Sequence, residues 1–316
     1  MQEIIHKLPQ DFIEKIKKIY PQKYHFILKT FLVKKEPCFR ANLIKINLEE
    51  FIRKLKAENI RFQRIPWYNE IFILKHPSQR EFQKTSLYQK GFVYLQNPSS
   101  ALPVLVLNPQ KEEKILDLCA APGSKTSQIA SLTQQKSEIT AVEKIKPRFY
   151  KLQANLRILG ITKVKTILAD GSFVWKKYPE YFDKVLVDAP CSSEAQFRVN
   201  FPKTFSYWSK RKVKEQQRKQ KRLIFSGIKA LKPGGILVYS TCTFSPEENE
   251  EVINWALMKF PKQIRLQEIK IPFPNYACGL TQWQGKTFSK QLTLARRIIP
   301  DNITEGFFIA KLQKTG

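Results

Sequence analysis

Histidine is scarce in this sequence and is confined to its beginning. The chain of 316 residues has three histidines, and the last of them is His76. Histidine is a frequent base for activating a nucleophilic serine or cysteine. A dyad of this kind therefore cannot be assembled from the residues after position 76 alone. If a cysteine acts in that region, its proton must pass to a different kind of group.

Two further absences concern membranes and metals. No run of about 18 apolar residues is present, and the N-terminus lacks the apolar segment of a secretory signal. We therefore expect a cytoplasmic protein without a membrane partner. The cysteines are widely spaced and include no CxxC pair, so neither a zinc ribbon, a disulfide framework nor another metal site is expected. The five cysteines are Cys38, Cys119, Cys191, Cys242 and Cys278.

Acidic residues are also few relative to basic ones. The chain has 27 Asp and Glu against 55 Lys and Arg, a formal net charge of +28. Such an excess favours a polyanionic partner, because basic side chains neutralise phosphates and release counterions. Nucleic acid is the favoured partner, and an anionic membrane surface is the main alternative. Hydrophobic residues make up 42% of the chain, which is enough for a folded core.

The pattern of apolar residues divides the chain into two predicted units. Residues 1–100 are predicted to form a small α+β unit, and residues 101–316 a larger α/β unit in which strands and helices alternate. The expected strands are 39–46, 61–65, 71–74, 91–95, 115–118, 139–142, 164–169, 185–187, 236–239, 264–269 and 306–312, the last two paired. The expected helices include 47–59, 124–132, 147–159, 209–231 and 247–260. Repeated β-α units predict a mostly parallel, Rossmann-like sheet with helices on both faces.

The segment Asp117–Lys125, DLCAAPGSK, is predicted to be a turn between a strand and a helix. Its small residues let the backbone approach a ligand, and the helix that follows offers free N–H groups. The next three strands end in acidic residues, Glu143, Asp170 and Asp188. Each acid alone is equally typical of a turn or helix cap. Together they favour a nucleoside cofactor, with Glu143 on the ribose hydroxyls and Asp170 near an adenine amino group.

Two cysteines each follow a buried-strand pattern. Cys191 lies in VLVDAPCSS and Cys242 in ILVYSTCTF. The carboxyl ends of parallel strands meet at the edge where open α/β sheets bind ligands. Thiolate is a strong nucleophile even as a minor form, so we predict covalent chemistry at these two positions. Asp188 lies in the same turn as Cys191 and could hold a heterocyclic base, whereas Cys38 and Cys278 are interpreted as structural.

A basic segment, Lys203–Arg222, carries nine Lys and Arg and one Glu. Phe205, Tyr207 and Trp208 near its start are suited to stacking on bases. A solvated helix face is the alternative interpretation of such a charge run. The residues expected to hold phosphates are Lys210, Arg211, Lys212, Arg218 and Arg222.

Three segments resemble the signature motifs of the NOL/NOP/Sun family of RNA cytosine-5 methyltransferases. They are CAAPGSK at 119–125, DAPCS at 188–192 and KPGGILVYSTCTFSPEENE at 232–250, and the likeness extends from about Phe39 to Leu312. The resemblance implies a class I methyltransferase fold with a seven-stranded sheet in residues 101–316 and an RNA-binding region in residues 1–100. It also implies S-adenosylmethionine as the methyl donor, rRNA or tRNA as the partner, and we expect a monomer.

The resemblance further implies a role for each site residue. Cys242 would be the nucleophile that adds to C6 of a cytidine, and Cys191 would assist release of the product. Asp188 would contact N3 and the exocyclic amine of the base. The residues that would line the cofactor site are Cys119, Ala120, Ala121, Pro122, Gly123, Ser124, Lys125, Glu143, Asp170 and Asp188.

The chain departs from the family pattern directly after Cys191. Where the family commonly has PCSGEG, this chain has PCSSEA, so Ser193 and Ala195 replace two glycines. This replacement narrows the backbone conformations open to the loop. Two other functions stay open: a catalytically silent RNA-binding or ribosome-assembly factor on the same fold, and a DNA cytosine methyltransferase in which Cys191 is the nucleophile.

Overall fold

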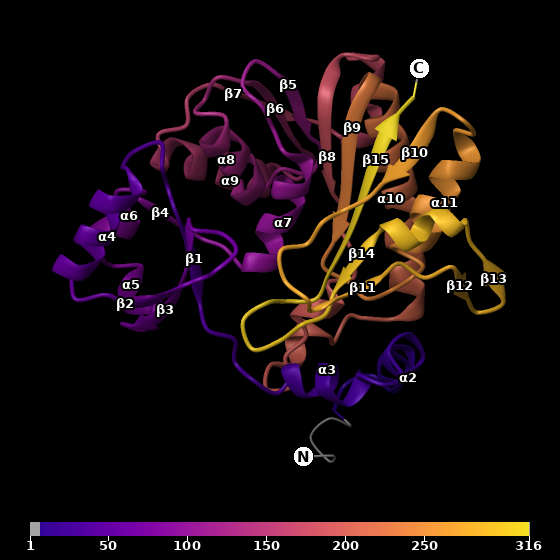
Figure 1. Ribbon diagram of the computed structural model, residues 1–316, viewed down its shortest axis with the longest axis horizontal. Coiled ribbons are helices and arrows are strands. Elements are labelled where there is room, and N and C mark those ends of the chain that lie inside the picture. Colours follow the sequence, from indigo (N-terminus) through magenta and orange to yellow (C-terminus); the bar gives the residue numbers. More distant parts are fainter. Residues whose placement is uncertain (1–6, 316) are drawn as a thin grey trace.

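The computed structural model describes residues 7–315, which form two main sheets (Figure 1). Residues 1–6, part of the predicted N-terminal unit, and residue 316 lie outside the described residues. The smaller sheet has the order β2-β3-β1-β4 and is antiparallel throughout. Its elements are β1 (Cys38–Ala41), α4 (Leu48–Ala57), β2 (Arg61–Arg64), β3 (Ile71–His76), α5 (Gln79–Phe82), α6 (Ser86–Gln89) and β4 (Val93–Leu95).

The core of the small sheet is aromatic. Phe39, Phe51 and Phe72 are fully buried, and the rings of Phe39 and Phe72 stack with their centroids 5.4 Å apart. Helix α4 covers this core and begins at the predicted cap, because the Asn47 side chain accepts a hydrogen bond from the N–H of Glu50 at 2.9 Å. Each phenylalanine thus removes a large apolar area from water, which stabilises a unit with few strands.

The first two helices belong with the large sheet. Helices α2 (Gln10–Ile19) and α3 (Tyr24–Thr30) lie apart from the small sheet in Figure 1, and their apolar residues join the core of the larger unit. The Phe12 ring packs against Phe197, with centroids 4.9 Å apart. The backbone of Phe31 accepts a hydrogen bond from Val199 at 3.1 Å. The N-terminal segment is therefore built into the unit that carries the predicted chemistry.

The large sheet confirms the predicted Rossmann-like α/β fold class. Its order is β11-β14-β15-β9-β8-β5-β6-β7, with β10 also paired to β15. The strands from β9 to β7 are parallel, whereas β15 is antiparallel to β9 and pairs with β10 as predicted. The sheet has nine strands instead of seven because residues 276–298 add two short strands, β11 and β14, at one edge. The bounds are β5 (Lys114–Asp117), β6 (Glu138–Glu143), β7 (Val164–Leu168), β8 (Phe182–Asp188), β9 (Leu231–Thr241), β10 (Ile264–Gln267), β11 (Tyr276–Cys278), β14 (Arg296–Ile298) and β15 (Phe307–Lys314).

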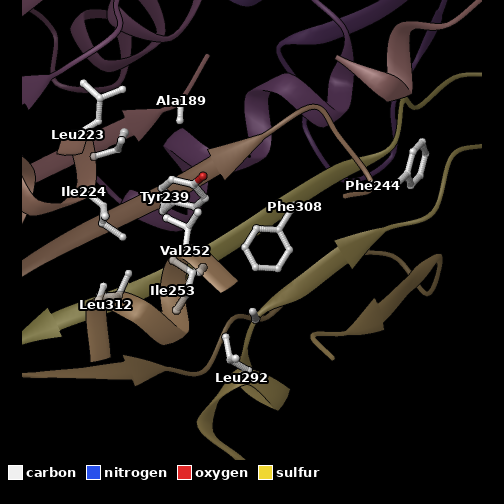
Figure 2. Packing of buried hydrophobic residues seen from close by; sticks show 14 of the residues in the cluster. Ala189, Leu223, Ile224, Tyr239, Phe244, Val252, Ile253, Leu292, Phe308 and Leu312 are labelled. Atoms are coloured by element: carbon white, nitrogen blue, oxygen red, sulfur yellow. The ribbon is translucent and has the colours of Figure 1, made fainter. Parts of the chain in front are cut away.

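Helices cover both faces of the large sheet. Because side chains alternate along a strand, Leu237 and Tyr239 belong to one apolar cluster and Val238 to the other. Figure 2 shows the first cluster, in which Tyr239 and Phe308 on neighbouring strands lie over Val252 and Ile253 of α11. The helices of the large unit are α7 (Pro98–Leu107), α8 (Ser124–Leu132), α9 (Lys146–Ile158), α10 (Lys210–Ala230) and α11 (Glu250–Lys259).

The carboxyl ends of the parallel strands bring the predicted site residues to one edge. Asp117, Glu143 and Asp188 are the last residues of β5, β6 and β8, and Cys242 directly follows β9. Since β8 pairs with both β5 and β9, these residues meet although they are far apart in sequence. Such an edge is where open α/β sheets bind ligands.

Candidate functional site

The turn between β5 and α8 has the close-packed backbone that its sequence predicts. Gly123, the residue before α8, has φ +104°, a left-handed conformation that glycine adopts without steric penalty. A Cβ atom there would lie 3.0 Å from Leu152 Cδ1 of α9. Helix α9 also holds the turn, because the Arg148 guanidinium donates to the carbonyl oxygen of Ala121 at 2.7 Å. The turn is thus fixed before any ligand binds.

A pocket of about 410 Å³ opens beside this turn. Glu143 is buried at its edge, and Glu143 Oε1 accepts a hydrogen bond from the N–H of Ile145 at 2.9 Å. Burial opposes ionisation of Asp170, but hydrogen bonds from Lys144 and Ser172 outweigh it and lower the pKa of Asp170. The pocket is lined by Leu118, Cys119, Glu143, Lys144, Ile145, Arg148, Asp170, Gly171, Ser172, Pro190, Gln216, Lys219, Arg222 and Leu223.

Helix α10 supplies another wall of this pocket and an acceptor without a partner. Gln216 Oε1 is buried and takes part in no hydrogen bond within residues 7–315. An unpaired buried acceptor is unfavourable, so a ligand with N–H or O–H donors would stabilise this wall. Together with the carboxylates of Glu143 and Asp170, it forms an acceptor set for hydroxyl and amino groups. The pocket therefore fits a nucleoside.

A second pocket, of about 490 Å³, adjoins the first and contains both predicted cysteines. The two pockets share Cys119, Arg148 and Pro190 in their walls. Cys191 Sγ lies 3.4 Å from Cys242 Sγ. The hydrogen bond with Cys242, together with burial, raises the pKa of Cys191 well above its ordinary value. Cys191 therefore keeps its proton at neutral pH while lying against the second sulfur.

The predicted cofactor residues divide between these two pockets. The first pocket holds Cys119, Glu143 and Asp170. The second holds Cys119, Ala121, Pro122, Ser124, Lys125 and Asp188. Ala120 and Gly123 belong to the same turn and shape its backbone. The structure thus separates the carboxylates at the ends of β6 and β7 from the lysine and aspartate beside the cysteines.

Asp188 is ion-paired within the cysteine pocket. Lys125 Nζ lies 2.6 Å from Asp188 Oδ2, and the Ser240 hydroxyl donates to Asp188 Oδ1 at 2.7 Å. Lys125 Nζ also donates to the Ser100 hydroxyl at 2.9 Å. Asp188 and Lys125 are predicted from the sequence motifs, whereas the two serines are not. Ser240 could have been found from its place two residues before Cys242 in the same motif.

A buried glutamate that was not predicted from the sequence joins the loop after β8, which holds Cys191, to the loop after β9, which holds Cys242. These two segments are called the Cys191 loop and the Cys242 loop. Glu248 accepts hydrogen bonds from the backbone N–H of Ser192 at 2.9 Å and from Gln220 Nε2 at 2.8 Å. Ser192 directly follows Cys191, whereas Glu248 belongs to the loop that begins at Cys242. Burial raises the pKa of Glu248 to about 7.

A second buried glutamate crosses in the opposite direction. Glu194, from the Cys191 loop, accepts a hydrogen bond from the N–H of Phe244 at 3.1 Å. Lys15 Nζ of α2 lies 3.0 Å from Glu194 Oε1. Burial opposes ionisation of Glu194, but Lys15 and nearby hydrogen bonds outweigh it and lower the pKa of Glu194. The motifs PCSSEA and SPEENE contain both glutamates, which is the only sequence signal for them.

The predicted phosphate-binding residues lie on α10, and three of them have acidic neighbours. Lys210 Nζ lies 2.6 Å from Asp11 Oδ1 of α2. Arg211 Nε and Lys212 Nζ lie 3.5 Å and 3.7 Å from the Glu215 carboxylate. Exposed pairs of this kind contribute little to stability and can exchange partners at low free-energy cost. The three side chains therefore remain able to contact phosphates.

The other two basic residues and the aromatic residues lie in distinct places. Arg218 and Arg222 are both exposed. Arg222 lines the pocket that contains Glu143, whereas Arg218 is not part of that lining. Tyr207 is 88% exposed and free to stack on a base. Phe205 and Trp208, expected to stack as well, pack partly buried against the core of the large unit. The local sequence predicts that these two rings face solvent, but their apolar contacts with the core keep them partly buried.

Two further findings concern membranes and metals. No helix in residues 7–315 has the length and apolar character needed to cross a bilayer. Among the described side chains, His, Cys, Asp and Glu form no group of three or more that could hold a metal ion.

Comparison with protein-family models gives two matches that together span most of the chain. Residues 104–313 match the model of the 16S rRNA methyltransferase RsmB/F. Residues 8–98 match the model of the N-terminal domain of the 16S rRNA methyltransferase RsmF. The first match includes the turn before α8 and both cysteine loops.

Individual relatives agree with these matches. The chain is 41% identical to the tRNA (cytosine(49)-C(5))-methyltransferase of Pyrococcus abyssi, over 88% of each protein. It is 34% identical to ribosomal RNA small subunit methyltransferase F of Pectobacterium carotovorum, over 98% of this chain and 63% of that protein. The crystal structure of a methyltransferase homologue from Pyrococcus horikoshii has a TM-score of 0.85 at 32% identity, covering 99% of each chain.

Proposed function

Because the chain belongs to the NOL/NOP/Sun family, in which the RsmB/F enzymes methylate RNA, we propose that it is an S-adenosylmethionine-dependent RNA cytosine-5 methyltransferase. The observation that carries this proposal is the pair of thiols 3.4 Å apart in a pocket that adjoins a nucleoside-sized pocket lined with carboxylates. The substrate is a cytidine in structured rRNA or tRNA, the two classes of RNA named for its relatives.

The first pocket is the proposed site for the cofactor. Glu143 is placed to accept hydrogen bonds from ribose hydroxyls, and Asp170 and the unpaired Gln216 carbonyl to accept them from amino groups. When bound, S-adenosylmethionine supplies an electrophilic methyl group. The shared wall of Cys119, Arg148 and Pro190 supports transfer from this pocket to the one that holds the cysteines.

The second pocket is the proposed site for the base. C5 of cytosine is a poor nucleophile until a thiolate adds at C6, which moves electron density onto C5 and N3. In the proposal the Cys242 sulfur forms the bond to C6, and the Asp188 carboxyl donates a proton to N3, where negative charge develops, and regains that proton after methyl transfer. The other Asp188 oxygen accepts a hydrogen bond from the exocyclic amine, and Lys125 and Ser240 hold the Asp188 side chain in position.

The second half of the reaction releases the enzyme. A base removes the proton from C5, the C5–C6 double bond re-forms, and the bond from C6 to Cys242 breaks with its electron pair returning to sulfur. Cys191 keeps its proton and lies against Cys242, which supports a role in protonating the departing thiolate. The base must leave its stack to reach both sulfurs, so unpaired nucleotides are the favoured targets.

Covalent trapping tests the proposal. In RNA containing 5-azacytidine, C5 is replaced by nitrogen, so no C5 proton can leave and the adduct persists. We expect wild-type protein and the Cys191→Ala variant to form an adduct that resists denaturation, and Cys242→Ala to form none. Cys278→Ala serves as the matched control, because Cys278 is exposed on β11 outside the lining of either pocket.

The same experiment separates the alternatives. A wild-type protein that binds the RNA without forming an adduct would be the catalytically silent factor. Loss of the adduct in Cys191→Ala, with capture intact in Cys242→Ala, would assign the nucleophile to Cys191, as in a DNA-type enzyme. Bisulfite sequencing of total RNA from wild-type and deletion cells then identifies the methylated cytidine.

A further inference from the structure

Ser193 adopts a backbone conformation that side chains rarely take. Its φ is +55° and its ψ +33°, in the left-handed region. For a residue with a Cβ atom this conformation costs about 1–2 kcal/mol relative to the right-handed region. The family pattern has glycine at this position, where the cost does not arise. This chain therefore retains a serine where backbone geometry alone favours glycine, and such departures concentrate at functional sites.

The Ser193 side chain points to the sulfur of the proposed nucleophile. Ser193 Oγ lies 3.7 Å from Cys242 Sγ and lines the same pocket. Within residues 7–315 this is the one hydrogen bond that the Ser193 hydroxyl makes to a protein group. The backbone supports the approach, because the N–H of Ala195 donates to the carbonyl oxygen of Cys242 at 3.1 Å. The loop is thus fastened to Cys242 two residues after the contact.

We propose that the Ser193 hydroxyl is a further catalytic group, which donates a hydrogen bond to Cys242 Sγ when that sulfur is ionised. In the thiol form Cys242 donates to the hydroxyl oxygen; on loss of the proton the hydroxyl rotates and becomes the donor. A hydrogen bond to the charged form stabilises that form, so Ser193 increases the fraction of thiolate. The inference rests on the nucleophilic role proposed for Cys242.

The other groups around Cys242 do not replace the Ser193 hydroxyl as a hydrogen-bond donor to the sulfur. The Cys191 thiol can donate one hydrogen bond to the same sulfur. Lys125 is engaged by Asp188 and Ser100 and is not directed to sulfur. The charged and titratable side chains that line the pocket with Cys242 are Tyr94, Cys119, Lys125, Arg148, Asp188, Cys191 and Glu305, and Glu248 lies near Cys191 outside this lining. The carboxylates among them disfavour a negative charge on the Cys242 sulfur. A neutral hydroxyl that can rotate to donate a hydrogen bond would offset part of this repulsion.

Two variants separate the hydroxyl from the backbone. Ser193→Gly removes the hydroxyl and relieves the left-handed conformation, whereas Ser193→Ala removes the hydroxyl and keeps the strain. The measurement is the rate at which iodoacetamide alkylates Cys242 as a function of pH, followed by peptide mass spectrometry without RNA or cofactor. We expect both variants to move the alkylation midpoint of Cys242 upward by about one pH unit, because a hydrogen bond to a charged group is lost. Cys278 is the internal reference, and its midpoint must not move.

The outcomes distinguish this inference from the proposed function. Equal midpoints in wild type and both variants would overturn the role of Ser193, even where Ser193→Gly raises the melting temperature by relieving strain. A shift in Ser193→Gly alone would assign the effect to the backbone, because Ser193→Ala also lacks the hydroxyl, and would overturn the inference too. Because no RNA is present, a shifted midpoint together with failed 5-azacytidine trapping would contradict the proposed reaction while leaving the hydrogen bond to the thiolate in place.

Discussion

Glu248 accepts a hydrogen bond from the backbone N–H of Ser192 at 2.9 Å, across 56 positions of the sequence. The Ser192 hydroxyl in turn lies 2.8 Å from the Thr243 hydroxyl, and each of these residues directly follows one of the paired cysteines. One buried carboxylate thus connects the loops after β8 and β9. Glu248, which lies outside the lining of the pocket, therefore helps to hold Cys191 and Cys242 at their 3.4 Å separation.

Removing this carboxylate is expected to separate the loops. Glu248→Ala leaves the Ser192 N–H and one N–H of the Gln220 amide buried without an acceptor, while the amide keeps its bond to the Pro190 carbonyl; the loss should destabilise the protein by roughly 3 kcal/mol. Glu248→Gln keeps an acceptor for both and is the matched control. We expect methyl transfer and 5-azacytidine trapping to fall more than tenfold in the first variant and less in the second. Equal activity and melting temperature in all three proteins would show that the loops hold their positions without Glu248.

Stability should fall as the pH rises from about 4.5 to about 7, in part because of Glu248. The pKa of Glu248 is raised from 4.5 to about 7, so the folded state binds the proton more tightly than the unfolded state. Its contribution is complete below pH 4.5 and lost as the pH approaches 7, a total of roughly 3 kcal/mol. Urea unfolding across this range should show a flatter dependence in Glu248→Gln. A residual slope is expected from Asp117, whose pKa burial raises from 3.8 to about 6.

The turn before α8 should tolerate no side chain at its glycine. Gly123→Ala forces a Cβ atom into a left-handed backbone and to within 3.0 Å of Leu152, so we expect a loss of about 1–3 kcal/mol and weaker cofactor binding. Gly234→Ala is the control: its φ is +78°, but nothing lies within 4 Å. Calorimetric titration with S-adenosylhomocysteine distinguishes the two variants. Under conditions in which both are folded, only Gly123→Ala should bind this ligand more weakly than the wild type.

Two of the exposed arginines of α10, Arg218 and Arg222, should affect different ligands. Arg222 lines the pocket that holds Glu143, so Arg222→Ala should weaken S-adenosylhomocysteine binding. Arg218 is not among the residues of that pocket, and Arg218→Ala should reduce the slope of log affinity for RNA against log salt by about 0.7–0.9. Filter binding over a range of salt measures the second effect. A salt slope that falls equally in both variants would place Arg222 on the RNA path instead.

The strand-end chemistry could be predicted because it depends on local patterns. Asp117, Glu143, Asp188 and Cys242 each follow an apolar strand core, and parallel strands bring such ends to one edge. The direction of a helix face could not be predicted in the same way. Arg222 lies in the charge run of α10, but how the helix rotates against β8 decides whether it meets a pocket or solvent.

Contacts between segments far apart in the sequence could not be predicted from the sequence pattern either. Nothing in SPEENE indicates that Glu248 bonds to Ser192, since the partner depends on how two loops meet after folding. The left-handed conformation of Ser193 was hidden for a related reason. A serine at a glycine position predicts a changed loop, whereas the structure keeps the glycine-like backbone and uses the hydroxyl.

The contact between Lys15 and Glu194 spans 179 positions, and Phe307, at the start of β15, lines the cysteine pocket. Segments near both ends of the described residues therefore contribute to one small region. Strand β9 has its antiparallel neighbour β15, and the pocket its Phe307 wall, only once residues 307–314 have been synthesised. A chain truncated before residue 307 is accordingly expected to leave this pocket open on one side.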